Sequence, residues 1–277
     1  MEDSLRNILK DIRHVALDMD GTIYLGGHLF ECTMPFLDTL TRLGISYSFL
    51  TNNPTQSLSD YVAKLRRMGI PCDNSQMYTT ATATIDYVRN RYPQARRLFI
   101  LGTPSMISQF DDAGFVSCED SAEDEPDVVV AAFDKTLQYS RLCRCAWWIS
   151  KSKPYIATNP DWVCPTDLPT ILVDCGSICA CLEAATGRKP DVVIGKPNPD
   201  ILLGVARNHG LQTSQIAMVG DRLYTDVKTA INAGSCGVLV LSGESTMQTV
   251  RESDVIPTLI CQDVGEFGRL LEEARNN

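Results

Sequence analysis

The sequence predicts an α/β protein with a mostly parallel sheet. Short strand-like apolar runs alternate with longer segments of helical periodicity along the 277 residues, and this alternation is typical of a parallel sheet covered by helices. Three strands, "HVALDMD", "SYSFLTNN" and "IAMVGD", run straight into polar residues at their carboxyl ends, and "CGVLVLS" is a fourth. Open α/β sheets bind ligands at this edge, so the three polar ends are expected to converge on one crevice.

The helices expected between these strands have recognisable ends. The segment "SLSDYVAKLRRMG" ends at Gly69, and "PDILLGVARNHG" has Pro199 near its start and Gly210 at its end. The segment "YTDVKTAINAG" closes on Gly234 in the same way. These helices directly follow the polar strand ends, so their amino termini are expected to direct backbone N–H groups at the crevice.

The middle of the chain reads as a second α/β unit. It has strands at "RRLFILG", "DVVVAAF" and "KPYIATN" and helices at "PSMISQFDDAG" and "YSRLCRCAWWIS", but no comparable cluster of polar strand ends. We therefore expect an insertion whose two ends return to one core. The predicted domains are a core of residues 1–81 and 187–277 and an inserted domain of residues 82–186.

Composition limits the classes of partner. The 44% hydrophobic content is ample for a core, and 25 Lys and Arg against 34 Asp and Glu give a net charge of -9, which disfavours nucleic acid or an anionic membrane as the main partner. The start, "MEDSLRNILKDIRH", is not a signal peptide, and the longest apolar runs are too short to span a bilayer. The sequence predicts a soluble, cytoplasmic protein.

The eleven cysteines lie in apolar or helical segments. Without a secretion signal, reduced core thiols are the favoured interpretation. A zinc site is a less favoured alternative, because the C-x-C and C-x-x-x-C spacings differ from the usual C-x-x-C knuckle. Its ligands would come from Cys143, Cys145, Cys175, Cys179 and Cys181.

Two aspartates one position apart follow the first strand. Asp18 and Asp20 share a face of an extended chain, and Gly21 lets the backbone turn sharply beyond them. Crowded carboxylates repel each other unless a cation lies between them. Mg²⁺ suits such a pair, because it binds carboxylates, waters and substrate phosphate. An ordinary Asp-Gly-Thr turn is the alternative.

Two further motifs carry groups that suit a phosphate. In "SFLTNNP", Thr51 and Asn52 can donate hydrogen bonds to phosphate oxygens, or can simply cap a turn. In "VIGKPNPD", Lys196 stands between a strand-like run and a helix start, although most lysines are only surface residues. A nucleotide-binding P-loop is disfavoured because Pro190 and Pro197 occupy positions that the motif gives to Gly and to Ser or Thr. No G-x-G-x-x-G follows a strand, which disfavours a dinucleotide cofactor.

The fourth motif is "MVGDRLYTDV", in which another strand ends in an acid. Asp221 stands at the strand tip directly after Gly220, and Asp226 follows near the start of a helix. A simple helix cap would explain Asp226. The same explanation fits Asp221 less well.

The order of the four motifs resembles that of the haloacid dehalogenase-like hydrolases over essentially the whole chain. The stretches "LDMDGTIYLGG", "LTNNP", "TNPD" and "GKPNP" resemble more narrowly subfamily IIA, the branch of the NagD-type and 4-nitrophenyl phosphatases. The resemblance implies a Rossmann-like core with a large α/β cap of the C2 type inserted between the second and third motifs.

The resemblance also implies roles for the first motif and for the lysine. Asp18 would be the nucleophile that forms an aspartyl-phosphate. Asp20 would be the general acid for the leaving group and then the base for water, while its backbone carbonyl binds Mg²⁺. Lys196 would neutralise both the phosphate and Asp18. The residues after Asp20, Gly21 to Gly27, are expected to form a short flap over the nucleophile.

The remaining roles concern the metal and the phosphate. The expected metal ligands are Asp18, Asp20 and Asp221, and Asp226 would support them without binding the ion. The expected phosphate-binding residues, besides the lysine, are Thr51, Asn52 and Asn53.

The insertion is expected to select the substrate. Polar turns in "TNPDW" and "DCGSI" could reach a leaving group, and ordinary turn or helix-cap roles are equally open for each candidate. The candidates are Asn159, Asp161, Asp174 and Ser177. Relatives in this branch act on small sugar phosphates, nucleotides, phosphoglycolate or pyridoxal phosphate, and the sequence does not choose among them.

The predicted function is Mg²⁺-dependent hydrolysis of a small phosphomonoester, with a phosphorylated metabolite as partner and neither nucleic acid nor membrane. Similarity to the family also suggests a homodimer through the cap. One alternative is a binding or regulatory module that turns over poorly on the same fold. A carbon-halogen hydrolase is less favoured, because that reaction needs no acid such as Asp20 for its leaving group.

Overall fold

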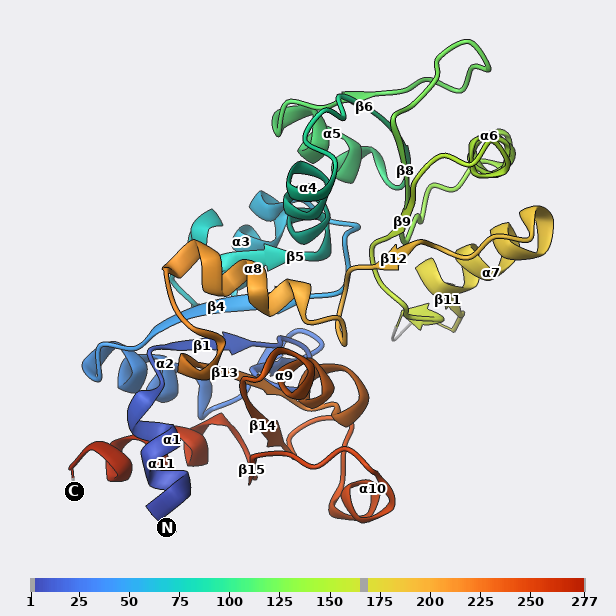
Figure 1. Cartoon of the computed structure of the whole chain (residues 1–277). Helices are drawn as coiled ribbons and strands as arrows, with labels where there is room; N and C mark the ends of the chain where they lie inside the picture. Colours follow the sequence, from blue (N-terminus) through green and yellow to red (C-terminus); the bar gives the residue numbers. More distant parts are fainter. Residues whose placement is uncertain (1–2, 165–168, 277) are drawn as a thin grey trace. The chain divides into compact units, whose positions relative to one another are not determined.

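The computed structural model describes residues 3–164 and 169–276 (Figure 1). The chain divides into two compact units. The first contains the described residues of Met1–Thr51, Val62–Tyr78 and Lys196–Asn277, and the second contains Asn52–Tyr61 and Thr79–Gly195.

A six-stranded sheet forms the centre of the first unit, in the order β15-β14-β13-β1-β4-β5. The four neighbouring pairs from β15 to β4 are parallel, with Leu17 of β1 opposite both Val219 of β13 and Phe49 of β4. The strands are β1 (His14–Leu17), β4 (Ser46–Thr51), β5 (Met77–Thr79), β13 (Ile216–Gly220), β14 (Cys236–Val240) and β15 (Leu259–Cys261). This register aligns the polar ends that were predicted to converge.

Helices cover this sheet. Every residue of β1, β13 and β14 is buried as a result. The first and last helices, α1 and α11, pack against each other, α11 also packs on α2, and α8 packs on α9 (Figure 1). The helices are α1 (Asp3–Asp11), α2 (Thr33–Arg42), α3 (Leu58–Arg67), whose start belongs to the second unit, α8 (Asp200–His209), α9 (Lys228–Ala233), α10 (Met247–Glu252) and α11 (Val264–Asn276), with 3-10 turns at η1 (Asn74–Gln76) and η2 (Thr213–Gln215).

The helix ends follow the sequence prediction, with one local difference. Gly210 ends α8 at φ +64° and Gly234 ends α9 at φ +67°, and both lie in the left-handed region that suits glycine. The segment expected as one helix over "YTDVKTAINAG" begins instead with a π-helical turn, η3 (Leu223–Val227). In this turn the N–H of Val227 donates to the carbonyl of Arg222 at 3.2 Å. Such turns recur at functional sites.

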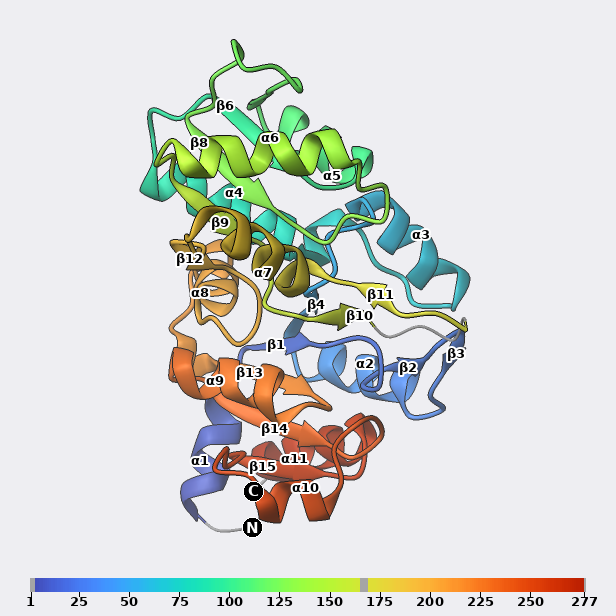
Figure 2. The same ribbon diagram turned by 90° about the vertical axis from the view of Figure 1, so that its right-hand side faces the viewer.

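The second unit has its own parallel sheet of five strands, in the order β12-β9-β8-β6-β7. Helix α6 packs across β6 and β8 (Figure 2), over a core that includes Phe99, Trp148 and Tyr155. The strands are β6 (Arg97–Leu101), β7 (Val116–Ser117), β8 (Val128–Ala131), β9 (Tyr155–Ala157) and β12 (Val192–Val193). The helices are α4 (Thr80–Arg91), α5 (Pro104–Asp112), α6 (Tyr139–Ser150) and α7 (Cys175–Thr186), and β10 (Val163–Cys164) pairs antiparallel with β11 (Leu172–Val173).

The fold is therefore α/β, with a parallel core sheet and a separate sheet in the inserted unit, as predicted. The extent of that unit differs from residues 82–186. Because β12 pairs with β9, residues 187–195 belong to the second unit, and so does the segment Asn52–Tyr61. All eleven cysteines are free of disulfides. None of the described helices combines the length and the apolar character that crossing a membrane requires.

Candidate active site

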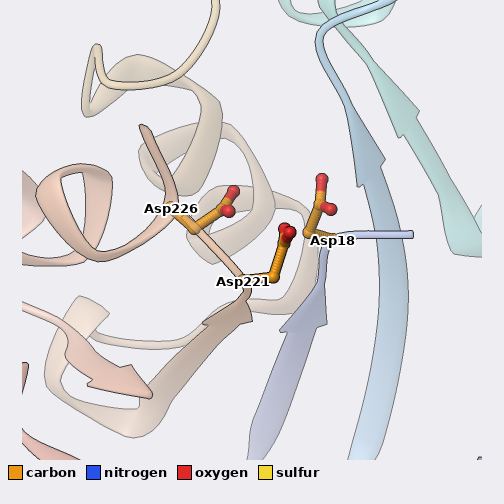
Figure 3. Close-up of side chains that lie close together, drawn as sticks. All are labelled: Asp18, Asp221 and Asp226. Carbon is orange, nitrogen blue, oxygen red and sulfur yellow. The ribbon is translucent and has the colours of Figure 1, made fainter. Parts of the chain in front are cut away.

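Three acidic side chains gather at the carboxyl edge of the core sheet. Asp18 directly follows β1, and its N–H donates to the carbonyl of Val219 at 2.8 Å, while Asp221 directly follows the adjacent strand β13. Asp226 comes from the π-helical turn η3. One carboxylate oxygen of each aspartate lies within 4.8 Å of the other two, and the three side chains lie close together at the strand ends (Figure 3). Two of the four sequence motifs thus supply a single cluster.

Lys196 joins this cluster. Its ammonium group lies 2.6 Å from Oδ1 of Asp226 and also contacts Asp18. Lys196 is only 3% exposed, so it is not an ordinary surface lysine. Burial alone would lower the pKa of Lys196, but the two carboxylates outweigh burial and raise it, so the ammonium form is firmly held.

The charges in the cluster do not balance. Burial raises the pKa of Asp18 to about 7, helped by the two other carboxylates and opposed by Lys196. Burial and repulsion from Asp226 likewise raise the pKa of Asp221 to about 6. Three carboxylates face one ammonium group, so two negative charges stay uncompensated when all are ionised. A divalent cation would compensate them.

A loop that the sequence analysis did not single out surrounds Asp221. The backbone N–H of Glu244 donates to Oδ2 of Asp221 at 2.7 Å, and the hydroxyl of Ser242 donates to the carbonyl of Gly21 at 2.8 Å. This loop follows β14, which neighbours β13 in the sheet. The sequence does contain a signal for this loop, because "CGVLVLSGES" is a fourth strand that runs into small and polar residues.

Two glycines leave just enough room for the Asp221 carboxylate. A Cβ at Gly243 would lie 2.6 Å from Cγ of Asp221, and a Cβ at Gly21, whose φ is +81°, would lie 2.8 Å from the same atom. Within the described part of the chain, Oδ1 of Asp221 is buried and receives no hydrogen bond. A buried carboxylate oxygen without a donor suits a hard cation. The donor set therefore fits a divalent metal ion.

Asp20 lies apart from the three clustered carboxylates. It is exposed and forms an isolated bridge with Tyr24. Tyr24 lies within the predicted flap, Gly21 to Gly27, and begins β2 (Tyr24–Leu25), which pairs antiparallel with β3 (His28–Leu29) just beyond the predicted flap. Lys64 donates to the Tyr24 hydroxyl at 3.0 Å and lies over its ring. The backbone of Asp20 is thus paired with that of Tyr24, and its carboxylate is not one of the three that form the cluster.

The second motif is divided between the two units. Thr51 ends β4, beside β1, whereas Asn52 and Asn53 belong to the second unit. Oδ1 of Asn53 accepts hydrogen bonds from the N–H of Thr55 at 2.9 Å and from its hydroxyl at 2.7 Å. This geometry fits the turn interpretation of Asn53, and the side chain of Asn52 is instead directed to Asp161.

The four candidates for substrate selection, Asn159, Asp161, Asp174 and Ser177, all make local contacts within the second unit. Asp174 caps α7 by accepting from the N–H of Cys175 at 2.6 Å. The hydroxyl of Ser177 donates to the carbonyl of Trp162 at 2.7 Å. The first three candidates share one hydrogen-bonded network.

Known proteins resemble the chain over nearly its full length. A family described as haloacid dehalogenase-like hydrolase matches residues 15–116, and a HAD-hydrolase-like family matches residues 193–267. The acid sugar phosphatase of Staphylococcus aureus (strain USA300) is 32% identical over 265 residues, which are 96% of this chain and 100% of that protein.

Two solved structures extend the comparison. The 4-nitrophenylphosphatase of Thermotoga maritima is 40% identical, with a TM-score of 0.88 over 95% of this chain and 98% of that one. NagD from E. coli K-12 is 28% identical, with a TM-score of 0.83 over 92% of this chain and 98% of that one. With the carboxylate cluster at its sheet edge, the chain belongs to the haloacid dehalogenase-like hydrolases, in the branch of the NagD-type and 4-nitrophenyl phosphatases.

Proposed function

We propose that this chain is a phosphatase that hydrolyses small phosphomonoesters through an aspartyl-phosphate on Asp18. The observation that carries the proposal is the position of the Asp18 carboxylate, which contacts the buried ammonium group of Lys196 and faces two further carboxylates. Phosphoryl transfer depends mostly on positioning and on stabilisation of charge. The sugar phosphatase and the 4-nitrophenylphosphatase among its relatives support a small phosphomonoester as the substrate.

Each step follows from the chemistry of the side chains. The Asp18 carboxylate attacks phosphorus, forming an O–P bond as the ester P–O bond breaks. Asp20 gives its proton to the departing alkoxide, then takes a proton from the water that attacks the aspartyl-phosphate and releases inorganic phosphate. Lys196 neutralises the negative charge that Asp18 and the phosphate share.

The phosphate itself needs donors that hold its oxygens. We assign this role to Thr51, Asn52 and Asn53, because a hydroxyl, side-chain amides and backbone N–H groups at a strand end are suitable donors. The residues of the inserted unit would select the leaving group, and that unit would act as the cap. The homodimer and the cytoplasmic location expected from the sequence stay predictions.

We infer that Mg²⁺ is the metal, held by the carboxylates of Asp18 and Asp221 and by the backbone carbonyl of Asp20. Asp226 lies close enough to contribute an oxygen but also pairs with Lys196, which favours a supporting role. The unpartnered Oδ1 of Asp221 and the excess negative charge support a divalent ion there. Bound in this position, Mg²⁺ would neutralise the carboxylates and the incoming phosphate.

The direct experiment measures release of 4-nitrophenol from 4-nitrophenyl phosphate with and without Mg²⁺. We expect turnover by the wild type that depends on the metal, and a loss of at least about 1,000-fold in Asp18→Asn, because an amide is a poor nucleophile and cannot form the intermediate. Thermal unfolding of both proteins checks that the variant is folded. The exposed Asp60, which caps its own helix turn, provides a matched control, Asp60→Asn, expected to keep full activity.

The same measurements can reject the proposal. If the wild type binds phosphate with Mg²⁺ but does not turn over any of several sugar phosphates, nucleotides or 4-nitrophenyl phosphate, the chain is a binding or regulatory module. If Asp18→Asn keeps full activity, Asp18 is not the nucleophile.

A further inference from the structure

A continuous chain of hydrogen bonds links Asn52 to the amino terminus of α7. Nδ2 of Asn52 donates to Oδ2 of Asp161 at 2.9 Å, and Nδ2 of Asn159 donates to the same oxygen at 3.1 Å. Nδ2 of Asn159 also donates to Oδ1 of Asp174 at 2.9 Å, which in turn accepts from the N–H of Cys175. All five residues belong to the second unit.

This network uses the polar groups that were expected to face a leaving group. Asn159 is only 1% exposed, and its amide nitrogen donates to two carboxylates while its Oδ1 accepts from the Thr158 hydroxyl at 2.8 Å. Asp174 is 3% exposed and also caps a helix. These two side chains are therefore occupied inside the unit. The network extends from them, through Asp161, to a residue of the second motif.

The loop that carries Asp161 is held firmly at its backbone. The N–H of Gly176 donates to the carbonyl of Asp161 at 2.8 Å, and the N–H of Asp174 donates to the carbonyl of Trp162 at 3.1 Å. A Cβ at Gly176 would lie 2.9 Å from the Asp161 carbonyl oxygen, so the helix start and the loop approach as closely as a glycine allows. These backbone contacts therefore hold the loop, and with it the Asp161 carboxylate, in one position.

Asn52 is fixed on its other sides as well. A Cβ at Gly195 would lie 2.7 Å from Oδ1 of Asn52, so the amide oxygen packs against a position where only glycine fits. The hydroxyl of Thr80 donates to the backbone carbonyl of Asn52 at 3.0 Å. A carboxylate can only accept hydrogen bonds, so Asp161 requires the Nδ2 end of the Asn52 amide to face it. The amide is thus held in one of its two nearly isosteric orientations.

We propose that Asp161 is a positioning residue that orients the Asn52 amide for phosphate binding. The inference rests on the proposed function, in which Asn52 holds a phosphoryl oxygen. Orienting a donor before the ligand arrives removes an ordering cost from binding. The two amide donors on Oδ2 of Asp161 also offset a negative charge that would otherwise disfavour a nearby phosphate.

The test is a double-mutant cycle with Asp161→Asn, Asn52→Ala and the double variant. Its readouts are kcat and KM for 4-nitrophenyl phosphate and the Kd of inorganic phosphate measured by calorimetry with Mg²⁺. We expect Asp161→Asn to raise KM and the phosphate Kd together by about tenfold, with kcat within about threefold, because an asparagine no longer dictates which end of the Asn52 amide faces it. In the Asn52→Ala background the same substitution should have no further effect.

Two more variants separate positioning from a general loss of structure. Asp127→Asn is a matched control, because the Asp127 carboxylate also accepts from two N–H groups, those of Arg96 at 2.7 Å and Arg97 at 2.9 Å, but has no part in this network. It should leave KM unchanged. Asp161→Glu keeps a carboxylate acceptor and should recover part of the phosphate affinity that Asp161→Asn loses. If Asp161→Asn does not fold, Asp161→Glu replaces it in the cycle.

Two results would overturn the inference: a wild-type KM and phosphate Kd in Asp161→Asn, or losses that multiply in the double variant. The proposed function fails separately, if the wild type binds phosphate without hydrolysing an ester. In that case the cycle is read from the calorimetric Kd alone. A wild type that does not bind phosphate at all would contradict both.

Discussion

The ammonium nitrogen of Lys196 lies 2.6 Å from Oδ1 of Asp226, although the two residues come from different motifs of the sequence. Asp226 is fully buried, and its Oδ2 accepts from the N–H of Arg222 at 3.1 Å. The π-helical turn η3 carries Asp226. Lys196 is therefore held by Asp226 as well as by Asp18, which it also contacts.

Replacement of the buried lysine tests this arrangement. Lys196→Met keeps most of the side-chain volume but leaves Asp18 and Asp226 buried without their cation, and breaking a buried ion pair typically costs about 3–5 kcal/mol. We expect a clear fall in the thermal unfolding temperature of the metal-free protein and a loss of activity of about 100-fold or more. Lys189→Met is the control, because the Lys189 side chain is 76% exposed and its ion pair with Glu183 is long, at 3.6 Å. An unfolding temperature equal to that of the wild type would contradict the structural role of Lys196.

Removal of one acid from the cluster should have the opposite effect on stability. Asp221 is buried, and burial with repulsion from Asp226 raises its pKa to about 6. A raised carboxylate pKa means that keeping the group ionised above that pH destabilises the fold, here by about 3 kcal/mol. We therefore expect Asp221→Asn to unfold at a higher temperature than the wild type at pH 8 without metal.

The same variant should respond differently to Mg²⁺. The wild type gains stability as the ion binds the folded state, by about 2.7 kcal/mol when Mg²⁺ reaches 100 times its Kd. Asp221→Asn should show little of this gain and no measurable turnover. A variant stabilised by Mg²⁺ as strongly as the wild type would remove Asp221 from the metal site.

The glycines around Asp221 provide an independent test. A Cβ at Gly243 would lie 2.6 Å from Cγ of Asp221, so Gly243→Ala has to displace that carboxylate. We expect the Mg²⁺ concentration for half-maximal activity to rise by about tenfold or more, because displaced ligands and their supports cost metal affinity on this scale. Gly27→Ala is the matched control, since among the described residues a Cβ there would meet no atom within 4 Å. Equal Mg²⁺ requirements in the two variants would show that Gly243 does not help to place the Asp221 carboxylate for metal binding.

The role of Asp20 can be separated from that of Asp18 by the choice of leaving group. Asp20→Asn should lower kcat for a sugar phosphate by about 100-fold or more, the usual contribution of a general acid, with phosphate affinity little changed. The loss should be smaller for 4-nitrophenyl phosphate, because 4-nitrophenolate departs without prior protonation. Equal losses for both substrates would contradict the general-acid assignment in the first step.

The fold was largely predictable because its signals are local. Strands that run into polar residues and helices that close on Gly210 or Gly234 are visible in the sequence. The strand-like run before Lys196, where β12 lies, is visible too, but two half-buried residues, Val192 and Val193, do not indicate which sheet they join. Its pairing with β9 is set by tertiary contacts, and for this reason the second unit extends beyond residue 186.

The charged cluster was predictable in its residue types but not in its contacts. Carboxylates and a lysine at strand ends indicate a charged cluster, whereas the ion pair of Lys196 with Asp226 depends on a π-helical turn that has no clear sequence signal. Glu244 was missed because it acts through its backbone N–H, which almost any residue type can supply. The direction of the Asn52 side chain toward Asp161 depends on a contact 109 residues away along the chain.

A buried histidine at the opposite end of β1 makes the fold sensitive to acid. His14 is fully buried, with its ring nitrogens 2.7 Å from the hydroxyl of Ser46 and 2.8 Å from that of Ser48. Burial, with a smaller contribution from His209, lowers the pKa of His14 to about 3. The unfolded chain then binds a proton near pH 6.5 that the folded protein does not bind until about pH 3. Stability should therefore fall as the pH drops below 6.5, by about 1.4 kcal/mol per pH unit.

The comparison of wild type with His14→Gln isolates this effect. Carboxylates with raised pKa values shift stability in the opposite direction, but they are common to both proteins and cancel in the difference. Urea unfolding of the metal-free proteins should show the wild type the more stable at pH 7.5, and this advantage should shrink by about 2 kcal/mol at pH 5, because only the wild type has an imidazole that charges on unfolding. His28→Gln, at an exposed position, should keep the wild-type pH dependence. Parallel pH profiles for wild type and His14→Gln would mean that His14 takes up its proton as readily in the folded protein as in the unfolded chain, and would contradict the lowered pKa of His14.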